Sequence, residues 1–346
     1  MSRKPRKPTE PLPVAEADIS IVCQEGDRVS HEVESMIYTG ETPWHGIGKS
    51  VEPWLPVNEA IEAAGVDWTV DLEPVYASTA SPGSEYPSSF EAINGYMRTV
   101  RSTDRNTLGI VKSKYMPIQN IDTFNWFNEF IEERLAYIEA AGSLRGGRIV
   151  WLLARINRDA VSPIDGDELR PYILLSNSHD GTKAARVGFT EVRVVCMNTM
   201  IAAHSGDDSE LVRILHKGDA KERLEAARTA FDTVYLDMVD RAQVYAGLAA
   251  TKITMGKLDE YISAVFNIKP RNERKRGGGV LDDVRANFFV ELDRSGMNWW
   301  SAFNAVTAYL SHDAARNADN RYSSLWFGVN AKKLTSALAV AVAMAK

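Results

Sequence analysis

The chain has 346 residues, of which 45% are hydrophobic and 25% charged, a balance typical of globular proteins that excludes disorder or a fibrous repeat throughout. Its formal charge of −6 excludes a generic polycation, so a nucleic-acid site has to be a local basic surface. The two cysteines, Cys23 and Cys196, exclude a disulfide framework and a four-cysteine zinc site, and they favour a reducing compartment.

The N-terminal segment, residues 1–35, is predicted to be a flexible tail. Four prolines and no large aromatic residue stand in its first 18 residues, so this stretch buries too little apolar surface to order itself. The first 18 residues are basic but lack the apolar core of a signal peptide. The longest apolar run of the chain, residues 334–345, is shorter than the roughly 20 residues of a membrane-spanning helix. We therefore expect no association with a membrane.

Residues 36–206 are predicted to form a core rich in strands. Pro56 opens a short helix over residues 57–64, which Gly65 ends. Alternating polar and apolar residues with turn-forming residues between them then predict strands and one helix. The ranges are 68–78, 94–102 and 107–118 for three strands, 122–134 for the helix, 136–156 for a hairpin, and 170–178 and 184–199 for two further strands.

Two local features of this core give definite expectations. Asp122 is predicted as the N-cap of the helix over residues 122–134. Apolar residues at helical spacing predict its buried face. They are Phe124, Phe127, Phe130 and Ile131. At the centre of the predicted hairpin, Gly146 and Gly147 can supply the positive φ that a tight turn requires.

Residues 207–346 are predicted to form a helical region that covers the strands or mediates contacts between subunits. Helical spacing of apolar residues predicts five helices. Their ranges are 219–250, 257–268, 281–292, 299–312 and 331–346. An aromatic cluster in this region favours a core or a subunit interface. Its members are Trp299, Trp300, Phe303, Trp326 and Phe327. The fold class is therefore expected to be α+β, with an antiparallel β-rich N-terminal core and a helical C-terminal part.

Several long segments resemble the phage/plasmid-like protein family, domain of unknown function 932. They are MIYTGETPWHGIGKS (36–50), AGSLRGGRIVWLLARI (141–156), LLSNSHDGTKAARVGFTEVRVVCMNT (174–199), GMNWWSAFNAVTAYLSH (296–312) and RYSSLWFG (321–328). The resemblance covers residues 36–327 and implies the DNA biology of mobile elements. Because no targeting segment is visible, we expect a location in the cytoplasm of a bacterial host cell. It implies no particular reaction and no catalytic residue.

A second resemblance concerns topology alone. A helix, three antiparallel strands and a helix follow one another over residues 57–134. This order is similar to the core of the single-strand annealing recombinases that phages encode. Many α+β domains share it, so the resemblance rests on analogy between folds.

The hairpin from Tyr96 to Tyr115 is the first candidate site. It carries five cations against one acid. The cations are Arg98, Arg101, Arg105, Lys112 and Lys114. Lys112 and Lys114 are two residues apart and are expected to share one strand face. Cations that contact phosphates, beside a tyrosine that can stack on a base, are what single-strand binding requires. The alternative is a solvated sheet face, or an edge that lysines protect.

Two glycine-containing basic loops are further candidates. Arg145 and Arg148 flank the two glycines of the predicted turn, where a phosphate can approach the backbone. A loop over residues 269–279 carries a run of cations before three glycines and could order on a polyanion. Its candidate binding residues are Arg271, Arg274, Lys275 and Arg276. The alternatives are a turn with solvated arginines and a disordered solubilising loop.

The most enzyme-like residues are His179, Asp180 and Cys196. His179 and Cys196 could form a base and nucleophile, or His179 and Asp180 could hold a metal. However, Asp180 precedes a glycine between two predicted strands, which is a strong hairpin signal. Cys196 stands in an apolar run, where a buried and unreactive thiol is the commoner state.

These patterns favour ATP-independent binding of single-stranded DNA, with annealing as a further role, in phage or plasmid recombination or replication. We expect no cofactor, no metal and no covalent chemistry, and we expect the protein to form homo-oligomers. Two alternatives stay open at this point. One is an enzyme centred on His179, Asp180 and Cys196, and the other is a protein-binding module that acts against host defence.

Overall fold

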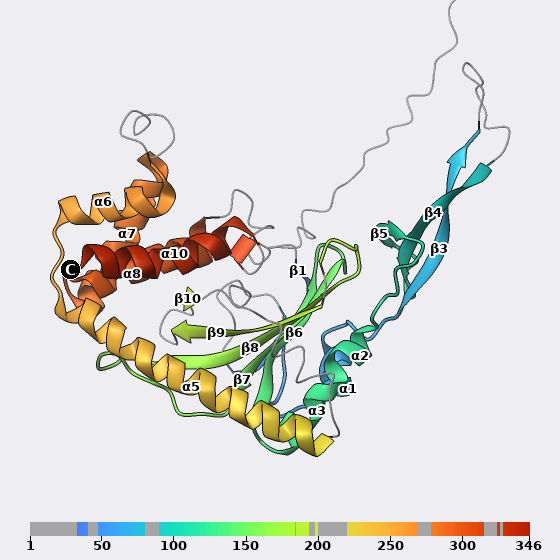
Figure 1. Cartoon of the computed structure of the whole chain (residues 1–346), viewed down its shortest axis with the longest axis horizontal. Coiled ribbons are helices and arrows are strands. Elements are labelled where there is room, and N and C mark those ends of the chain that lie inside the picture. The colour runs from blue at the N-terminus through green and yellow to red at the C-terminus, as the bar shows by residue number, and fades with distance from the viewer. Residues whose placement is uncertain are drawn as a thin grey trace, which may run out of the picture.

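The computed structural model describes residues 33–40, 48–79, 90–183, 185–193, 198–199, 220–268, 278–314, 324–325 and 328–346. Several predictions fall outside these residues. They concern most of the N-terminal tail, Cys196, Trp326, Phe327, and Arg271, Arg274, Lys275 and Arg276 of the basic loop. The described part confirms the α+β fold class, with strands in the first half of the chain and long helices in the second (Figure 1).

A seven-stranded sheet forms the centre of the molecule. Its strands are β1 (Val33–Tyr38), β2 (Lys49–Ser50), β6 (Ala136–Leu144), β7 (Ile149–Ile156), β8 (Leu169–Ser178), β9 (Arg186–Arg193) and β10 (Asn198–Thr199). The order across the sheet is β10-β9-β8-β7-β6-β1-β2, and every pair is antiparallel except β1 with β2. Strands that follow one another from β6 to β10 lie side by side, because tight turns connect antiparallel neighbours. β1 begins at Val33, inside the segment predicted as the tail.

Short helices cover one face of this sheet. They are α1 (Val57–Ala63), α2 (Asn120–Phe124), the 3-10 turn η2 (Asn125–Phe127) and α3 (Asn128–Glu132). Phe124, Phe127 and Phe130 are fully buried against Leu152 and Leu175 of the sheet. The predicted apolar face of the helix is therefore confirmed, because burial follows the local spacing of large apolar residues.

The start of that helix differs from the prediction. It begins at Asn120 with Gln119 as the N-cap, so the prediction of Asp122 as the N-cap is wrong. The Asn120 side chain is buried and donates to the backbone carbonyls of Val66 and Trp68, over 2.8 and 3.3 Å. These contacts to the preceding loop fix the first turn two residues earlier than the local sequence pattern indicates.

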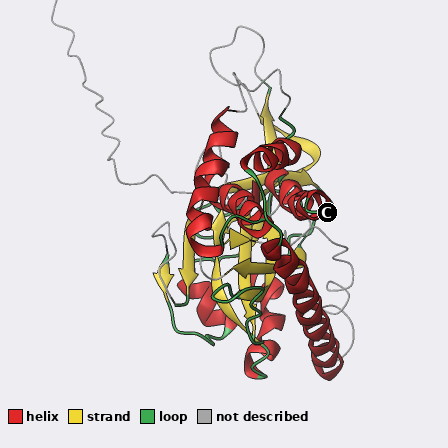
Figure 2. Ribbon diagram, turned by 90° about the vertical axis from the view of Figure 1, so that its left-hand side faces the viewer, coloured by secondary structure: helices red, strands yellow, loops and turns green. Residues whose placement is uncertain are grey.

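The C-terminal helices form a second core with residues of the same sheet. They are α5 (Ala220–Ala250), α6 (Met255–Phe266), α7 (Gly278–Ser295), α8 (Trp299–Ala308) with a π-turn η5 (Tyr309–Asp313), and α10 (Val329–Met344). Trp300 and Phe303 are fully buried in one cluster with Trp151 and Leu174 of the sheet. The aromatic residues at the start of α8 are thus core residues. Seen from the side of these helices, the strands lie behind them (Figure 2).

A separate three-stranded sheet forms an arm that projects from the body (Figure 1). It consists of β3 (Val70–Ser78), β4 (Phe90–Arg101) and β5 (Thr107–Lys112) in the order β3-β4-β5. At its base the Thr99 hydroxyl donates to the carbonyl oxygen of His179 over 2.8 Å. A Cβ on Gly109 would lie 2.5 Å from Asp180 Cα, so only glycine permits this approach. The arm is thus anchored to the turn between β8 and β9.

Within the described residues, a search of the helices for a stretch with the length and hydropathy of a membrane span gave no candidate.

Candidate nucleic-acid interface

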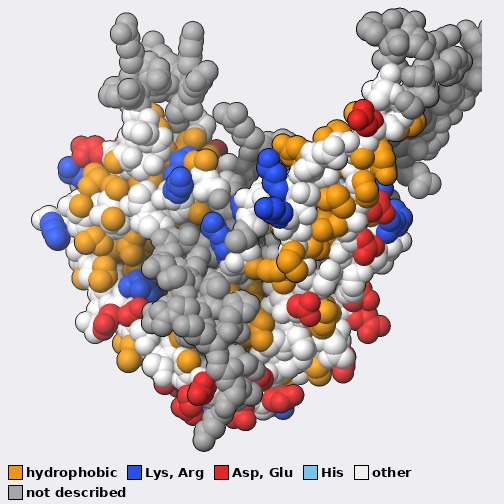
Figure 3. Space-filling view, turned by 45° about the vertical axis from the view of Figure 1, so that its right-hand side comes forward, with side chains coloured by type: hydrophobic (Ala, Val, Ile, Leu, Met, Phe, Trp, Pro, Cys, Tyr) orange, Lys and Arg blue, Asp and Glu red, His pale blue; other side chains and the backbone are white. Residues whose placement is uncertain are grey.

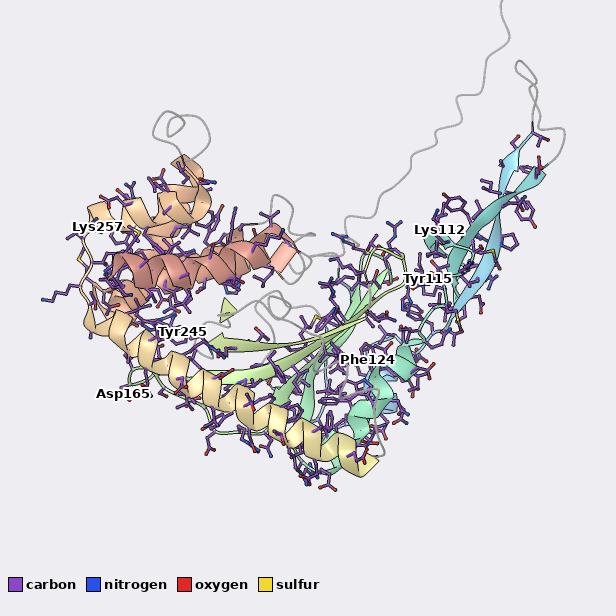
Figure 4. All side chains as sticks on the ribbon, in the orientation of Figure 1. Lys112, Tyr115, Phe124, Asp165, Tyr245 and Lys257 are labelled. Atoms are coloured by element: carbon purple, nitrogen blue, oxygen red, sulfur yellow. The ribbon has the colours of Figure 1, made fainter. Side chains whose placement is uncertain are left out.

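Tyr96 and Lys112 are direct neighbours across β4 and β5 of the arm. Lys112 Nζ donates to the Tyr96 hydroxyl over 3.2 Å and lies 4.7 Å from the ring centroid. Both side chains are exposed, Tyr96 to 41%. In Figure 4 Lys112 lies on the side of the arm that is turned toward the hairpins of the large sheet. The structure therefore brings a cation and an aromatic ring together at an accessible position, as the sequence predicts.

Arg98 and Arg105 are neutralised by carboxylates of β3. Arg98 Nε donates to Glu73 Oε2 over 3.0 Å, and Arg105 forms ion pairs with Asp71 and Glu73. The excess of cations counted along the hairpin is thus largely cancelled by the neighbouring strand. Charge counting over residues 96–115 missed this, because the two acids precede that range.

Arg101 is a structural residue. Its side chain is 8% exposed and forms ion pairs with Glu34 at 2.7 Å and Asp104 at 2.5 Å. Its guanidinium also lies 5.5 Å from the centroid of the Trp68 ring. Hydrogen bonds from Arg101 lower the pKa of Asp104 well below its usual range, so the pair stays charged. Arg101 therefore joins the arm to β1, and a phosphate could reach it only by breaking these contacts.

Lys114 lies in a turn and not on a strand. β5 ends at Lys112, and the Tyr115 N–H donates to the Lys112 carbonyl over 2.9 Å. The prediction that Lys112 and Lys114 share one strand face is therefore wrong. The chain turns here because the Tyr115 hydroxyl donates to the Ser178 carbonyl of β8 over 3.2 Å. Lys114 is nevertheless exposed.

The turn between β6 and β7 has the predicted backbone. Gly146 and Gly147 have φ of 64° and 81°, and Arg145 also has a positive φ of 57°. A Cβ on Gly147 would lie 2.8 Å from Arg101 Nη1 and 3.1 Å from Trp68 Cζ2. The turn is therefore packed against the base of the arm, and Arg145 and Arg148 remain exposed beside it.

The neighbouring turn between β8 and β9 adds two cations. Lys183 is half-buried, and its pKa is lowered first by burial and then by the charges of Arg145 and Arg186. Arg148 lies near Asp180 of the same turn, since its charge helps to lower the pKa of that carboxyl. We call these four residues, Arg145, Arg148, Lys183 and Arg186, the hairpin-tip cluster. Sequence reasoning missed Lys183 and Arg186 as binding residues. The sequence did hold a signal for them. The strands β6 to β9 follow one another as antiparallel neighbours, so the β6–β7 turn and the β8–β9 turn lie at the same end of the sheet.

Figure 3 shows lysine and arginine side chains on the arm and on the body. Apolar side chains run along the arm in the same view. The arrangement offers cations at more than one point along a path from the arm to the body, as a bound polyanion requires.

His179 does not have the geometry of a catalytic base. Its ring is 0% exposed, and its Nε2 lies 2.7 Å from Asn120 Oδ1. Because the Asn120 amide nitrogen donates to Val66 and Trp68, its oxygen must accept, so Nε2 carries the proton. Nδ1 is buried without a hydrogen-bond partner, and burial lowers the pKa of His179 to about 4. His179 is therefore a neutral residue beneath the arm.

The other enzyme-like residues are also engaged or outside the described chain. Burial alone would raise the pKa of Asp180, but hydrogen bonds from Ser178 and Thr182 keep it below its usual range. The Asp180 carboxylate thus closes its own turn. Cys196 lies outside the described residues. In the described part of the chain, no three histidine, cysteine, aspartate or glutamate side chains are grouped as a metal site would need.

A polar cluster that the sequence did not indicate lies at the opposite end of β6, β7 and β8. Tyr172 donates to Glu139 Oε1 over 2.8 Å, and Arg155 Nη1 donates to the Tyr137 hydroxyl over 2.9 Å. Burial raises the pKa of Glu139. These groups satisfy one another across three strands, which is the ordinary arrangement for buried polar side chains.

The comparison with protein families gives one match. The family described as Domain of unknown function (DUF932) matches residues 107–326, which is more than half of the chain. The chain belongs to the DUF932 family. The resemblance seen in the sequence segments is confirmed at this level. No curated protein and no solved structure matches the chain.

The DUF932 match covers only part of the candidate surface. The matched range begins at the first residue of β5, so it includes Lys112 and the whole hairpin-tip cluster. Strands β3 and β4, with Tyr96 and the carboxylates that neutralise Arg98, precede it. The family assignment therefore covers most of the cations but not the aromatic part of the arm.

Proposed function

We propose that this DUF932 protein binds single-stranded DNA without ATP. The observation that carries the proposal is the exposed pair of Tyr96 and Lys112 on the part of the arm against which the turn between β8 and β9 packs. A Cβ on Gly181 of that turn would lie 2.9 Å from Val111 Cγ1, and Figure 4 shows Lys112 on the side of the arm turned toward the large sheet. Lysine and arginine side chains would contact the phosphates, and the tyrosine ring would stack on a base. Stacking on a strand requires unpaired bases, which favours single strands over duplex DNA.

The structure changes which residues we assign to this surface. Arg98 and Arg101 are left out, because Glu73 and Glu34 already pair with them. The proposed contacts are Tyr96, Lys112, Lys114, Arg145, Arg148, Lys183 and Arg186. Because the chain has a net charge of −6, affinity depends on this local group of cations and is expected to be strongly salt-dependent.

The biological setting belongs to the same proposal. The resemblance to phage/plasmid-like proteins supports a role in the recombination or replication of mobile elements, with strand annealing as the further activity. An enzyme centred on His179 is not proposed, since that ring is buried and hydrogen-bonded to Asn120. A protein-binding role against host defence has no described contact that favours it.

The proposal is tested by fluorescence anisotropy with a labelled single-stranded oligonucleotide across a salt series. Wild type is expected to bind at low salt without nucleotide, and more tightly than it binds duplex. Each lost phosphate contact changes the log–log salt slope by about 0.7. Reversing both Lys112 and Lys114 to glutamate should therefore weaken binding and flatten the slope by at most about 1.4.

A matched control carries the same charge change elsewhere. Lys252→Glu with Lys257→Glu alters two exposed lysines on the helical side, where Figure 4 shows Lys257 far from Lys112. This variant should keep the salt slope of wild type. An absence of binding at low salt would refute the function. Equal loss in both double variants would refute the assignment to the arm.

A further inference from the structure

The outer half of β4 has an open edge. β3 pairs with it at Tyr76–Ala92 and Ser78–Phe90, whereas β5 pairs with β4 only from Tyr96 onward. An irregularity in the ladder, with Gly95 at φ 83°, separates the two halves of the strand. Among the described residues, the side of β4 that faces away from β3 therefore has no strand partner over residues 90–94, while the Gly95 carbonyl accepts from the Ser113 N–H over 3.0 Å. Residues 90–94 are all exposed.

This edge is apolar and unprotected. Phe90 is 66% exposed, Ile93 41% and Tyr76 on the adjacent strand 57%. Proteins usually block an open edge with lysine or proline, but residues 90–95 contain neither and carry one charge, Glu91. The edge of β5, by contrast, bears Lys112. A two-stranded ribbon is also only marginally stable in water, whereas three or more strands with an apolar face are stable.

We infer that the outer half of β4 is a dimer interface that pairs with the same strand of a second copy of this chain. The antiparallel pairing would join two arms into one four-stranded sheet, β3-β4-β4-β3. The inference goes beyond DNA binding and uses a different part of the arm from Lys112. It accounts for a strand that is extended and apolar yet exposed on both faces.

The sequence of the strand suits a second copy of itself. A two-fold axis at Ala92 places Ala92 opposite itself and Glu91 opposite Ile93 of the second copy, so no like charges meet. The same register places Phe90 opposite Asn94 and leaves Gly95, whose carbonyl accepts from the Ser113 N–H, outside the pairing. The arm projects away from the body, so two copies can approach edge to edge with their bodies apart (Figure 1). A contact of this size predicts a weak, concentration-dependent dimer.

Sedimentation velocity of the full chain without DNA, over a range of concentrations, tests the inference. Wild type is expected to shift from monomer to dimer at micromolar concentrations. Ile93→Lys places a charge next to the centre of the pairing and should weaken dimerisation at least tenfold. Ile110→Lys is the matched control, because Ile110 is a 61% exposed isoleucine on β5 of the same sheet. It should dimerise as wild type does.

Hydrogen exchange locates the contact. The amides of residues 90–94 should gain protection as wild-type concentration rises, while those of β5 should not. Circular dichroism confirms that both variants are folded. The inference is overturned if wild type stays monomeric throughout. It is equally overturned if a wild-type dimer persists in Ile93→Lys, or if Ile110→Lys weakens it to the same extent.

Discussion

Burial of neutral His179 beneath the arm should make the stability of this protein fall in weak acid. The pKa of His179 is about 4 in the folded chain, against an ordinary value of 6.5. Between these values the unfolded chain binds a proton that the folded chain refuses, so acid favours unfolding. The contribution is fully present above pH 6.5 and is lost as the pH falls toward 4.

The size of the effect follows from the shift. The difference of about 2.5 pKa units corresponds to about 3.4 kcal/mol in full, of which about 2 kcal/mol is lost by pH 5. The physical cause is the burial of Nδ1, which has no hydrogen-bond partner. A proton added there would create a positive charge that no acceptor stabilises. The Trp68 ring lies beside His179, at 5.4 Å between ring centroids, and helps to keep water away from the imidazole.

The assay is urea unfolding at a series of pH values, for wild type and for His179→Gln. Glutamine can still donate to Asn120 but does not titrate. Between pH 7 and pH 5 the free energy of unfolding of the variant should therefore fall by about 2 kcal/mol less than that of wild type. Carboxylates titrate alike in both proteins, so their effect cancels when the unfolding free energy of the variant is subtracted from that of wild type. If the two proteins lose stability in parallel over this range, the reasoning about His179 is refuted.

Two further predictions concern stability. Gly147→Ala should destabilise the fold by about 1–3 kcal/mol, because its φ is positive and a Cβ would meet Arg101. Gly146→Ala has the same backbone strain but open space around it, so thermal melts should show the smaller loss; equal losses would refute the steric argument. Arg193→Met removes a 0% exposed guanidinium from the carboxylates of Asp167 and Glu291 and should cost about 3–5 kcal/mol in urea unfolding. Arg158→Met breaks a surface pair and should cost less than about 1 kcal/mol, so a similar loss in both would contradict the role of burial.

The sequence alone determined the local elements. Most helices and strands lie where the spacing of apolar residues predicted them, and Gly146 and Gly147 form the expected turn. Strands β1 and β2 were not predicted, and β5 ends at Lys112, well before the predicted end at residue 118. The phenylalanines from Phe124 to Phe130 face the core as expected. These features depend on residues a few positions apart, whose backbone preferences and periodicity are read directly from the chain. The start of α2 at Asn120 departs from the pattern, because its determining hydrogen bonds reach a loop more than 50 residues away.

The charge of the candidate surface was decided by tertiary structure. Arg98 and Arg101 read as free cations along the chain, but β3 brings Glu73 to the first and β1 brings Glu34 to the second, 67 residues away. In the same way, two separate turns bring Lys183 beside Arg145. Coulomb attraction and repulsion act through space between whichever groups strand pairing makes adjacent. A count of charges along the sequence therefore predicts that a segment is basic, while the neighbours that the fold supplies determine which of its cations can meet a ligand.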